Sequence, residues 1–454
     1  MTMWKRVSAA LTAAVLVCSS FGPARAAAET VVTTDVEVPM GDGVTLAAHV
    51  NAPQSPGEHP FVLFPSAWDQ SAAQSQIPAW KTAKKGYVTI SVAMRGFQES
   101  GGEIDVAGPK TVHDISTLID WALANTSADG RRIGIVGLSY AGGISLLAAA
   151  HDPRIRAVVS MSSWADLERA YYPNRTRAEF AIRALYQSAT ASGRPDAEMT
   201  DFYQDFLAFE NEDSIRAYAK VRSPSEYADA FQRNRPAVML GQELNDLAYA
   251  PDQIIDLYDR LPSPKRLELR PGDHISQSAQ GMIGIDNPLW KNVHRWLDAH
   301  VAGTDRSITT EDPVLIQPRT GGGLRPEETY RDRRSMPGTA RRFFLGGGLP
   351  TGTVGDTPPE PWSRTITHAY NWAVTREAVF VSYLREVFGG EPPRSTLGLV
   401  GREHAMIWRG DPILRWSKIR GRAKLHVTIT PSAEKGTVHA YLFDVDAGTP
   451  TRRS

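Results

Sequence analysis

Short strand-like runs alternate with longer segments of helical periodicity through the first two thirds of the chain. The runs lie at residues 61–64, 87–92, 133–136, 155–161, 237–240 and 266–269. Between them, apolar residues recur at helical spacing, as at Val112, Ile115, Ile119 and Ala122. Continuous apolar runs of this length are typical of strands buried on both faces of a sheet. We therefore predict an α/β fold whose sheet is mostly parallel and covered by helices on both faces.

The predicted sheet unit begins with a hairpin and ends with a helix. Residues 31–50 alternate apolar and polar around Gly41-Asp42-Gly43, which is a turn signal. Leu289, Val293 and Trp296 share one helical face near the other end. We expect this domain to span residues 27–303.

One interval interrupts the alternation of strands and helices. Residues 165–235 are charged, aromatic and helix-like, and they contain no strand-like run. This segment is either a plain helical insertion or a cap over a site, because loops at the carboxyl edge of such sheets carry the site. We favour the cap.

A different pattern follows residue 304. Gly and Pro become frequent, and short strands are predicted at residues 341–345, 378–383, 397–400, 424–430 and 438–445. This spacing is typical of an all-β sandwich. We therefore expect a second, C-terminal domain over residues 304–454.

The N-terminal residues have the pattern of an export signal. Lys5 and Arg6 precede a short apolar core at residues 9–17, and Ala24-Arg25-Ala26 matches a cleavage site. We predict a signal peptide over residues 1–26 and secretion from a bacterial cell. A lipoprotein signal at Cys18 is an alternative, although such a signal expects a small residue where this chain has Val17. The apolar core is too short for stable membrane insertion.

Charge and cysteine content narrow the function further. The chain has 50 basic and 50 acidic residues, so no overall field favours nucleic acid or an anionic membrane. Its single cysteine, Cys18, lies in the export signal, so the mature chain would have no disulfide and no thiol nucleophile. The sequence shows no metal-ligand cluster and no phosphate-binding loop, and we expect no cofactor.

The strongest chemical motif surrounds Ser139. A predicted strand runs into Gly137-Leu138-Ser139-Tyr140-Ala141, and a helix rich in small residues follows. This is either a glycine-rich turn with an incidental serine or a nucleophile elbow, in which a strained turn presents the serine hydroxyl. The strand before and the helix after favour the elbow.

A serine nucleophile needs a base and an acid, which follow it in the order acid then histidine. Asp246 lies just past the strand at 237–240, and His274 lies just past the strand at 266–269. We predict that His274 accepts the Ser139 proton and that Asp246 orients the imidazole. The other candidates for the acid are Glu243, Asp252 and Asp273. The other candidates for the base are His113, His151, His294, His300, His368, His404, His426 and His439.

These motifs resemble those of the X-Pro dipeptidyl-peptidase and cocaine-esterase (S15, CocE/NonD) family of α/β-hydrolases. The family's G-x-S-Y-x-G elbow is matched by Gly137, Ser139, Tyr140 and Gly142. Further matches are residues 40–46, Arg95-Gly96-Phe97 with Ser100-Gly101, and Pro271-Gly-Asp-His274. The resemblance implies an α/β-hydrolase fold with a helical cap and a C-terminal jelly-roll of the galactose-binding-like type.

The chain departs from the family pattern in two places. Where the family has a tyrosine that donates to the oxyanion, this chain has Trp68. Trp68 could donate through its indole N–H, a backbone N–H could serve instead, or Trp68 could only line the pocket. The backbone N–H of Tyr140 is the other predicted oxyanion donor. The chain also stops soon after residues 442–446, so we expect the jelly-roll to be incomplete.

The leading hypothesis is a secreted serine hydrolase that forms an acyl-enzyme on a small ester or peptide substrate, the peptide being of Xaa-Pro type. The alternative is a catalytically inactive hydrolase-fold protein that holds carbohydrate or cell wall through its jelly-roll. The complete set of Ser139, Asp246 and His274 favours the enzyme.

Overall fold

A computed structural model describes residues 29–262, 264–320, 323–367, 397–413, 417–434 and 436–445. The predicted signal peptide and the predicted strand at residues 378–383 lie outside these ranges, as does His368. No helix within the described ranges is long and apolar enough to span a membrane.

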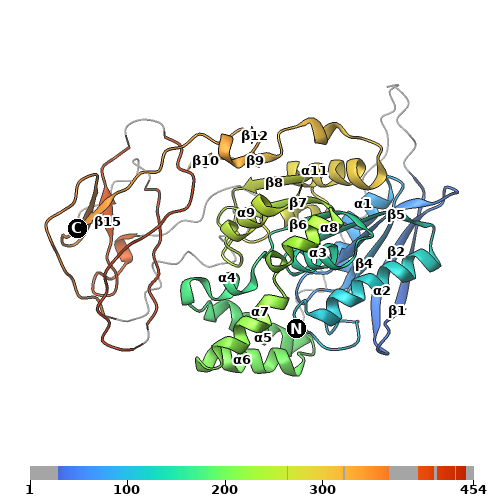
Figure 1. Ribbon diagram of the computed structural model, residues 1–454, viewed down its shortest axis with the longest axis horizontal. Helices are drawn as coiled ribbons and strands as arrows, with labels where there is room; N and C mark the ends of the chain where they lie inside the picture. Colours follow the sequence, from blue (N-terminus) through green and yellow to red (C-terminus); the bar gives the residue numbers. More distant parts are fainter. Residues whose placement is uncertain are drawn as a thin grey trace, which may run out of the picture.

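A ten-stranded mixed sheet forms the centre of the molecule (Figure 1), in the order β1-β2-β4-β3-β5-β6-β7-β8-β9-β12. The strands are β1 (Val31–Pro39), β2 (Thr45–Pro53), β3 (His59–Pro65), β4 (Val88–Val92), β5 (Ala128–Leu138), β6 (Ile155–Met161), β7 (Ala237–Glu243), β8 (Lys265–Arg270), β9 (Val314–Ile316) and β12 (Glu328–Tyr330). The block from β4 to β9 pairs in parallel, whereas β1, β2 and β12 pair antiparallel. The predicted hairpin and the predicted mostly parallel sheet are therefore confirmed.

Helices cover both faces of the sheet, as the alternation of strands and helices predicts. Along β3, Phe61 and Leu63 face one core, and Val62 and Phe64 face the other. The helices over the first core are α2 (Pro109–Asn125), α3 (Tyr140–His151), α8 (Ala228–Asn234) and α9 (Pro251–Arg260). Those over the second are α1 (Gln76–Ala83) and α11 (Pro288–Leu297). Burial on both sides explains why these strands read as continuous apolar runs.

The interval between β6 and β7 is helical. Four helices, grouped together to one side of the sheet (Figure 1), make up most of it. They are α4 (Leu167–Tyr171), α5 (Glu179–Ser192), α6 (Ala197–Ala208) and α7 (Glu212–Val221). The last helix of the interval, α8, instead packs against α3 and belongs to the sheet's helical layer. The inserted part is therefore shorter at its C-terminal end than the predicted range of 165–235.

The sheet continues beyond residue 303, where the sequence pattern placed the end of the first domain. Strands β9 and β12 extend it after β8, with β9 parallel to β8 and β12 antiparallel to β9. Each has only three residues. Three residues are too few to show the alternation of apolar and polar positions that marks a strand, so the sequence pattern could not distinguish these strands from the loops around them.

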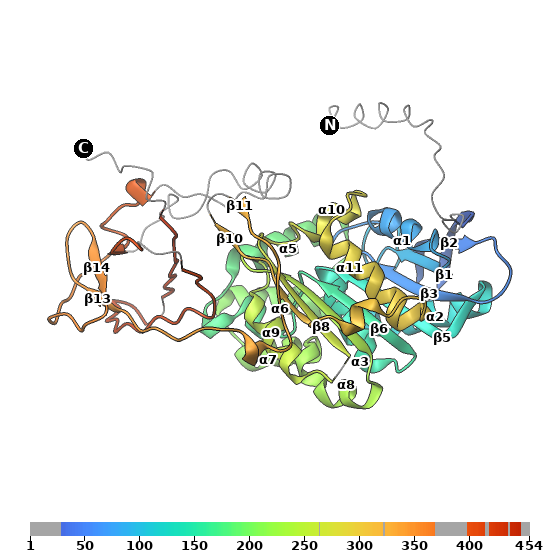
Figure 2. The same ribbon diagram turned by 90° about the horizontal axis from the view of Figure 1, so that it is seen from above.

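The predicted jelly-roll is not confirmed. The described residues after β12 form one three-stranded sheet of β13 (Phe344–Gly346), β14 (Gly352–Gly355) and β15 (Trp408–Gly410). Figure 2 shows this part at the opposite end of the molecule from β1 and β2.

Three further predicted strands are absent from the described C-terminal residues. The segment at 397–400 is a 3₁₀ turn, and neither 424–430 nor 438–445 forms a strand. Leu425, Val427 and Ile429 alternate as a strand face would, yet they are 45%, 45% and 53% exposed. An alternating pattern makes a strand only where a neighbouring strand completes its hydrogen bonds, and these segments have no such neighbour within the described ranges.

Candidate active site

Ser139 lies at the sharp turn between β5 and α3. Its backbone has φ 57° and ψ −119°, a strained conformation for a residue other than glycine. The strand and the helix pass so closely that a Cβ on Gly137 would lie 2.1 Å from the carbonyl oxygen of Ala141. A Cβ on Gly142 would lie 2.7 Å from that of Ser163. The turn thus has the geometry of a nucleophile elbow, and these contacts explain its two glycines.

The three residues predicted from separate segments come together at the carboxyl edge of the sheet. Ser139 follows β5, Asp246 follows β7 and His274 follows β8. His274 Nε2 lies 2.8 Å from Ser139 Oγ. His274 Nδ1 lies 3.0 Å from Oδ2 and 3.1 Å from Oδ1 of Asp246. These contacts form a continuous hydrogen-bonded path from the hydroxyl to the carboxylate.

Asp246 is held in place from several sides. Its Oδ1 accepts the backbone N–H groups of Ala248 and Tyr249, both at 2.8 Å. Its Oδ2 accepts Gln242 Nε2, also at 2.8 Å. The Asp246 side chain is fully buried. These donors hold the carboxylate in one orientation against the His274 ring.

The other candidates for the acid have different partners. Asp252 lies on α9 and pairs with Arg169 at 2.6 Å. Asp273 Oδ1 accepts the backbone N–H of Leu247 and that of its neighbour His274. Glu243 is bound by serine hydroxyls behind the site. Asp246, by contrast, lies within hydrogen-bond distance of the His274 ring through both carboxylate oxygens.

The environment of His274 favours its protonated form. Burial lowers the pKa of His274, but the negative charge and hydrogen bond of Asp246 raise it, as do Glu243 and Asp273. The net result is a pKa above the ordinary value of 6.5. By contrast, burial lowers the pKa of His294 and of His300 to about 4. His274 is therefore suited to hold a proton taken from Ser139.

The Tyr140 side chain is packed and hydrogen-bonded inside the protein, whereas its backbone N–H lies at the elbow. Its hydroxyl accepts the backbone N–H of Ala107 at 2.8 Å, and its ring lies among Trp68, Phe97 and Trp164. Tyr140 is the first residue of α3, so its N–H has no partner within the helix. That N–H can therefore face an oxyanion at the helix N-terminus.

The indole of Trp68 is engaged elsewhere. Trp68 Nε1 donates to Ser188 Oγ on α5 at 3.0 Å, so the expected indole donor is already occupied. In the same turn, the N–H of Ser66 donates to the Val92 carbonyl and that of Ala67 to Gln74 Oε1. The indole alternative therefore has no support, and a backbone N–H remains as the second donor.

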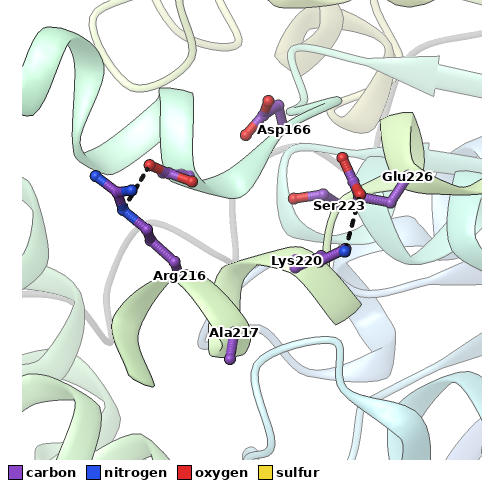
Figure 3. A pocket seen from close by; sticks show the side chains of 7 residues that line it. Asp166, Arg216, Ala217, Lys220, Ser223 and Glu226 are labelled. Atoms are coloured by element: carbon purple, nitrogen blue, oxygen red, sulfur yellow. Dashed lines mark ion pairs between the residues drawn. The ribbon is translucent and has the colours of Figure 1, made fainter. Parts of the chain in front are cut away.

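A hollow of about 250 Å³ lies between α4 and α7 and contains no member of the Ser139–His274–Asp246 set (Figure 3). It is lined by Asp166, Glu168, Arg216, Ala217, Lys220, Ser223 and Glu226. Arg216 pairs with Glu168 at 3.4 Å, and Lys220 with Glu226 at 3.9 Å. The charged side chains that line the hollow therefore largely form ion pairs with one another. Within the described ranges, no group of His, Cys, Asp and Glu residues could hold a metal ion.

Two residues behind the site, Ser162 and Ser278, were missed by the sequence reasoning. Both contact Glu243, which was considered only as an alternative acid. Ser162 directly follows the predicted strand at 155–161, at the same sheet edge as Ser139. That position is the only signal that could have pointed to it.

Comparison with known proteins agrees with this geometry. Residues 42–276 match the model of the X-Pro dipeptidyl-peptidase (S15 family), a range that contains the whole site. Cocaine esterase of Rhodococcus sp. (strain MB1 Bresler) is 29% identical over 180 residues, covering 37% of this chain and 31% of the esterase. An uncharacterized 31.7 kDa Escherichia coli protein is 32% identical over 130 residues, covering 28% of this chain and 44% of that protein. This chain thus matches less than half the length of these relatives.

Solved structures support the fold. A CocE/NonD family hydrolase from Staphylococcus aureus superposes with a TM-score of 0.55 at 14% identity, over 72% of this chain and 60% of that one. At this identity the likeness concerns the α/β-hydrolase fold alone. The family match spans more than half of the chain and includes the elbow, Asp246 and His274. This chain therefore belongs to the X-Pro dipeptidyl-peptidase (S15) family.

Proposed function

We propose that this protein is a serine hydrolase with Ser139 as nucleophile, His274 as general base and acid, and Asp246 as the orienting carboxylate. The observation that carries the proposal is the path from Ser139 Oγ through His274 to Asp246, with contacts of 2.8 and 3.0 Å on a strained elbow. A structural serine would need neither the strain nor an imidazole paired with a buried carboxylate.

The first half of the reaction forms an acyl-enzyme. Ser139 Oγ attacks the substrate carbonyl carbon while His274 Nε2 takes the hydroxyl proton. The carbonyl oxygen becomes an oxyanion that accepts the backbone N–H groups of Tyr140 and Trp68. The intermediate collapses as His274 returns the proton to the leaving alcohol or amine. The acyl group then remains on Ser139.

Water completes the cycle by the same path. His274 removes a proton from water, the hydroxide attacks the acyl carbon, and the proton returns to Ser139 as the acid product leaves. Throughout, Asp246 fixes the tautomer that leaves Nε2 free to accept, and it stabilises the imidazolium.

The proposed substrate is a small ester or an Xaa-Pro peptide, and we propose that the enzyme acts after export. The S15 family match supports the peptide, and the similarity to cocaine esterase supports the ester. Lys5, Arg6 and the Ala24-Arg25-Ala26 site support export. The described C-terminal residues give no support to the alternative of a carbohydrate-holding jelly-roll, since they form only a three-stranded sheet.

Labelling with a fluorophosphonate tests the nucleophile. The folded protein should gain one adduct, mapped to Ser139 by peptide mass spectrometry. Ser139→Ala should remain unlabelled and lose turnover of p-nitrophenyl acetate, with an unchanged thermal midpoint. Well-folded protein that takes no label, or Ser139→Ala that keeps its turnover, would overturn the proposal. Parallel assays with short p-nitrophenyl esters and with Xaa-Pro-p-nitroanilides then decide the substrate class.

A further inference from the structure

Glu243 is a buried acid that the proposed reaction does not use. It is the last residue of β7 and is 2% exposed. Its Oε2 lies 2.5 Å from Ser162 Oγ, and its Oε1 lies 3.3 Å from Ser278 Oγ. The two serine hydroxyls lie 2.9 Å from each other. The carboxyl group and the two hydroxyls therefore close a ring of three contacts.

Counting protons shows which form of Glu243 completes the ring. Two hydroxyls supply two protons for three oxygen–oxygen contacts, so an ionised carboxylate leaves one contact without a hydrogen. A neutral carboxyl group supplies the third: Glu243 donates to Ser162, Ser162 to Ser278, and Ser278 back to Glu243. Burial, followed by the charge of Asp246, raises the pKa of Glu243 to about 7. The neutral form is thus accessible near neutral pH.

The ring joins the segments that carry the proposed triad. Ser162 directly follows β6 and has φ 48°, and its N–H donates to the Gly241 carbonyl of β7. Ser278 begins the short helix α10 (Ser278–Met282), four residues after His274.

The His274 loop also wraps around the Glu243 side chain. The backbone N–H of Gln277 donates to Glu243 Oε1 at 3.2 Å. A Cβ on Gly272, at φ 144°, would lie 3.2 Å from Glu243 Cγ. The loop from His274 to Ser278 is thereby tied to the ends of β6 and β7.

We propose that Glu243 is a positioning residue that, with Ser162 and Ser278, fixes the His274 loop so that the imidazole meets Ser139. This inference rests on the proposed function. Asp246 from the same turn and His274 from the next loop are the titratable groups that act on Glu243, and Asp273 acts on His274 in the same sense. When Glu243 ionises, its charge raises the pKa of His274.

Two substitutions of Glu243 separate the effect of its hydrogen-bonded ring from the effect of its negative charge. Glu243→Gln keeps the volume, one acceptor and a donor, so it resembles the neutral acid and should hold kcat within about threefold. Glu243→Ala opens the ring and should lower kcat by ~10–100-fold with little change in KM, because a small misplacement of a catalytic group is costly. In Glu243→Gln, the acid limb of kcat/KM should move little, because Glu243, whose pKa is about 7, is already mostly neutral at the lower pH of that limb.

Glu311→Gln is the matched control, because it removes a carboxylate that is paired to Arg295 on α11. It should leave both kcat and the acid limb unchanged. Circular dichroism checks that each variant is folded. A folded Glu243→Ala with wild-type kcat, or a Glu243→Gln that loses as much kcat as Glu243→Ala, would overturn the role of Glu243. Failure of the proposed function itself would be seen separately, as a wild-type protein that is neither labelled nor active.

Discussion

At the scale of single residues, Asp246 raises the pKa of His274, the proposed base. His274 accepts a proton only while it is neutral, and Asp246 raises its pKa above 6.5 despite burial. Activity should therefore fall as the pH drops through a value above 6.5. The carboxylate also fixes the tautomer, since it accepts from Nδ1 and leaves Nε2 facing Ser139.

Asp246→Asn tests both effects of the carboxylate. We expect kcat to fall by about 10⁴-fold, because the amide can favour the wrong tautomer. The acid limb of the residual kcat/KM should move to lower pH, since the charge that raises the His274 pKa is lost. Asp252→Asn is the control, as Asp252 pairs with Arg169 and not with the imidazole. A pH profile that is identical in Asp246→Asn and wild type would contradict the assignment.

At the scale of elements, helix α5 of the insertion is fastened to the turn that carries Trp68. Ser188 accepts the Trp68 indole N–H, and Ser192 Oγ donates to Asp69. The two serines are four residues apart and share one face of α5. The turn also has Asp69 at φ 59°, a conformation that needs outside support. The insertion thus holds the turn that carries the proposed oxyanion donor.

Ser188→Ala should loosen this turn without removing a donor from the oxyanion. We expect kcat to fall by about tenfold with KM little changed, less than the 10²–10³ typical for loss of an oxyanion donor itself. Thr190→Ala is the matched control, because Thr190 bonds only to carbonyls of its own helix. If both variants behave alike in steady-state assays with a p-nitrophenyl ester, the link between α5 and the oxyanion turn has no catalytic role.

The sequence predicts those parts of the molecule that depend on local pattern. The six core strands are buried on both faces, so their composition alone identifies them, and the elbow and its two partners follow strand ends in a fixed order. Contacts between residues that are far apart in the sequence produce no such local pattern. The Trp68–Ser188 bond joins positions 120 residues apart, and the C-terminal alternation around Val427 lacks partner strands in the described structure.

At the scale of the whole molecule, helix α9 connects three parts of the chain. Asp256 pairs with Arg169 from α4 at 2.9 Å and also with Arg422 from the C-terminal part. Asp259 on the same helix pairs with Arg333, just beyond β12, at 2.6 Å. Since α9 begins five residues after Asp246, this network anchors the insertion and the C-terminal part close to the site.

Asp256→Asn should weaken this network in a pH-dependent way. Burial raises the pKa of Asp256, but Arg422 and Arg169 lower it further, to a net value below 3.8. The group's stabilisation is therefore fully present above pH 3.8 and is lost as the pH falls through the folded-state pKa. Because all three side chains are partly exposed, we expect a loss of only about 1 kcal/mol at pH 7. Urea unfolding measures it.

The sign of the pH dependence distinguishes this ion-pair network from simple packing. Once the pH is below the folded-state pKa of Asp256, both wild type and Asp256→Asn carry a neutral side chain, so their unfolding curves should converge, and 1 M salt should narrow the gap at pH 7. Asp201→Asn, an exposed position on α6, should show no gap at either pH. A gap for Asp256→Asn that stays constant from pH 7 to below that pKa would mean that shape, and not charge, holds the three parts together through α9.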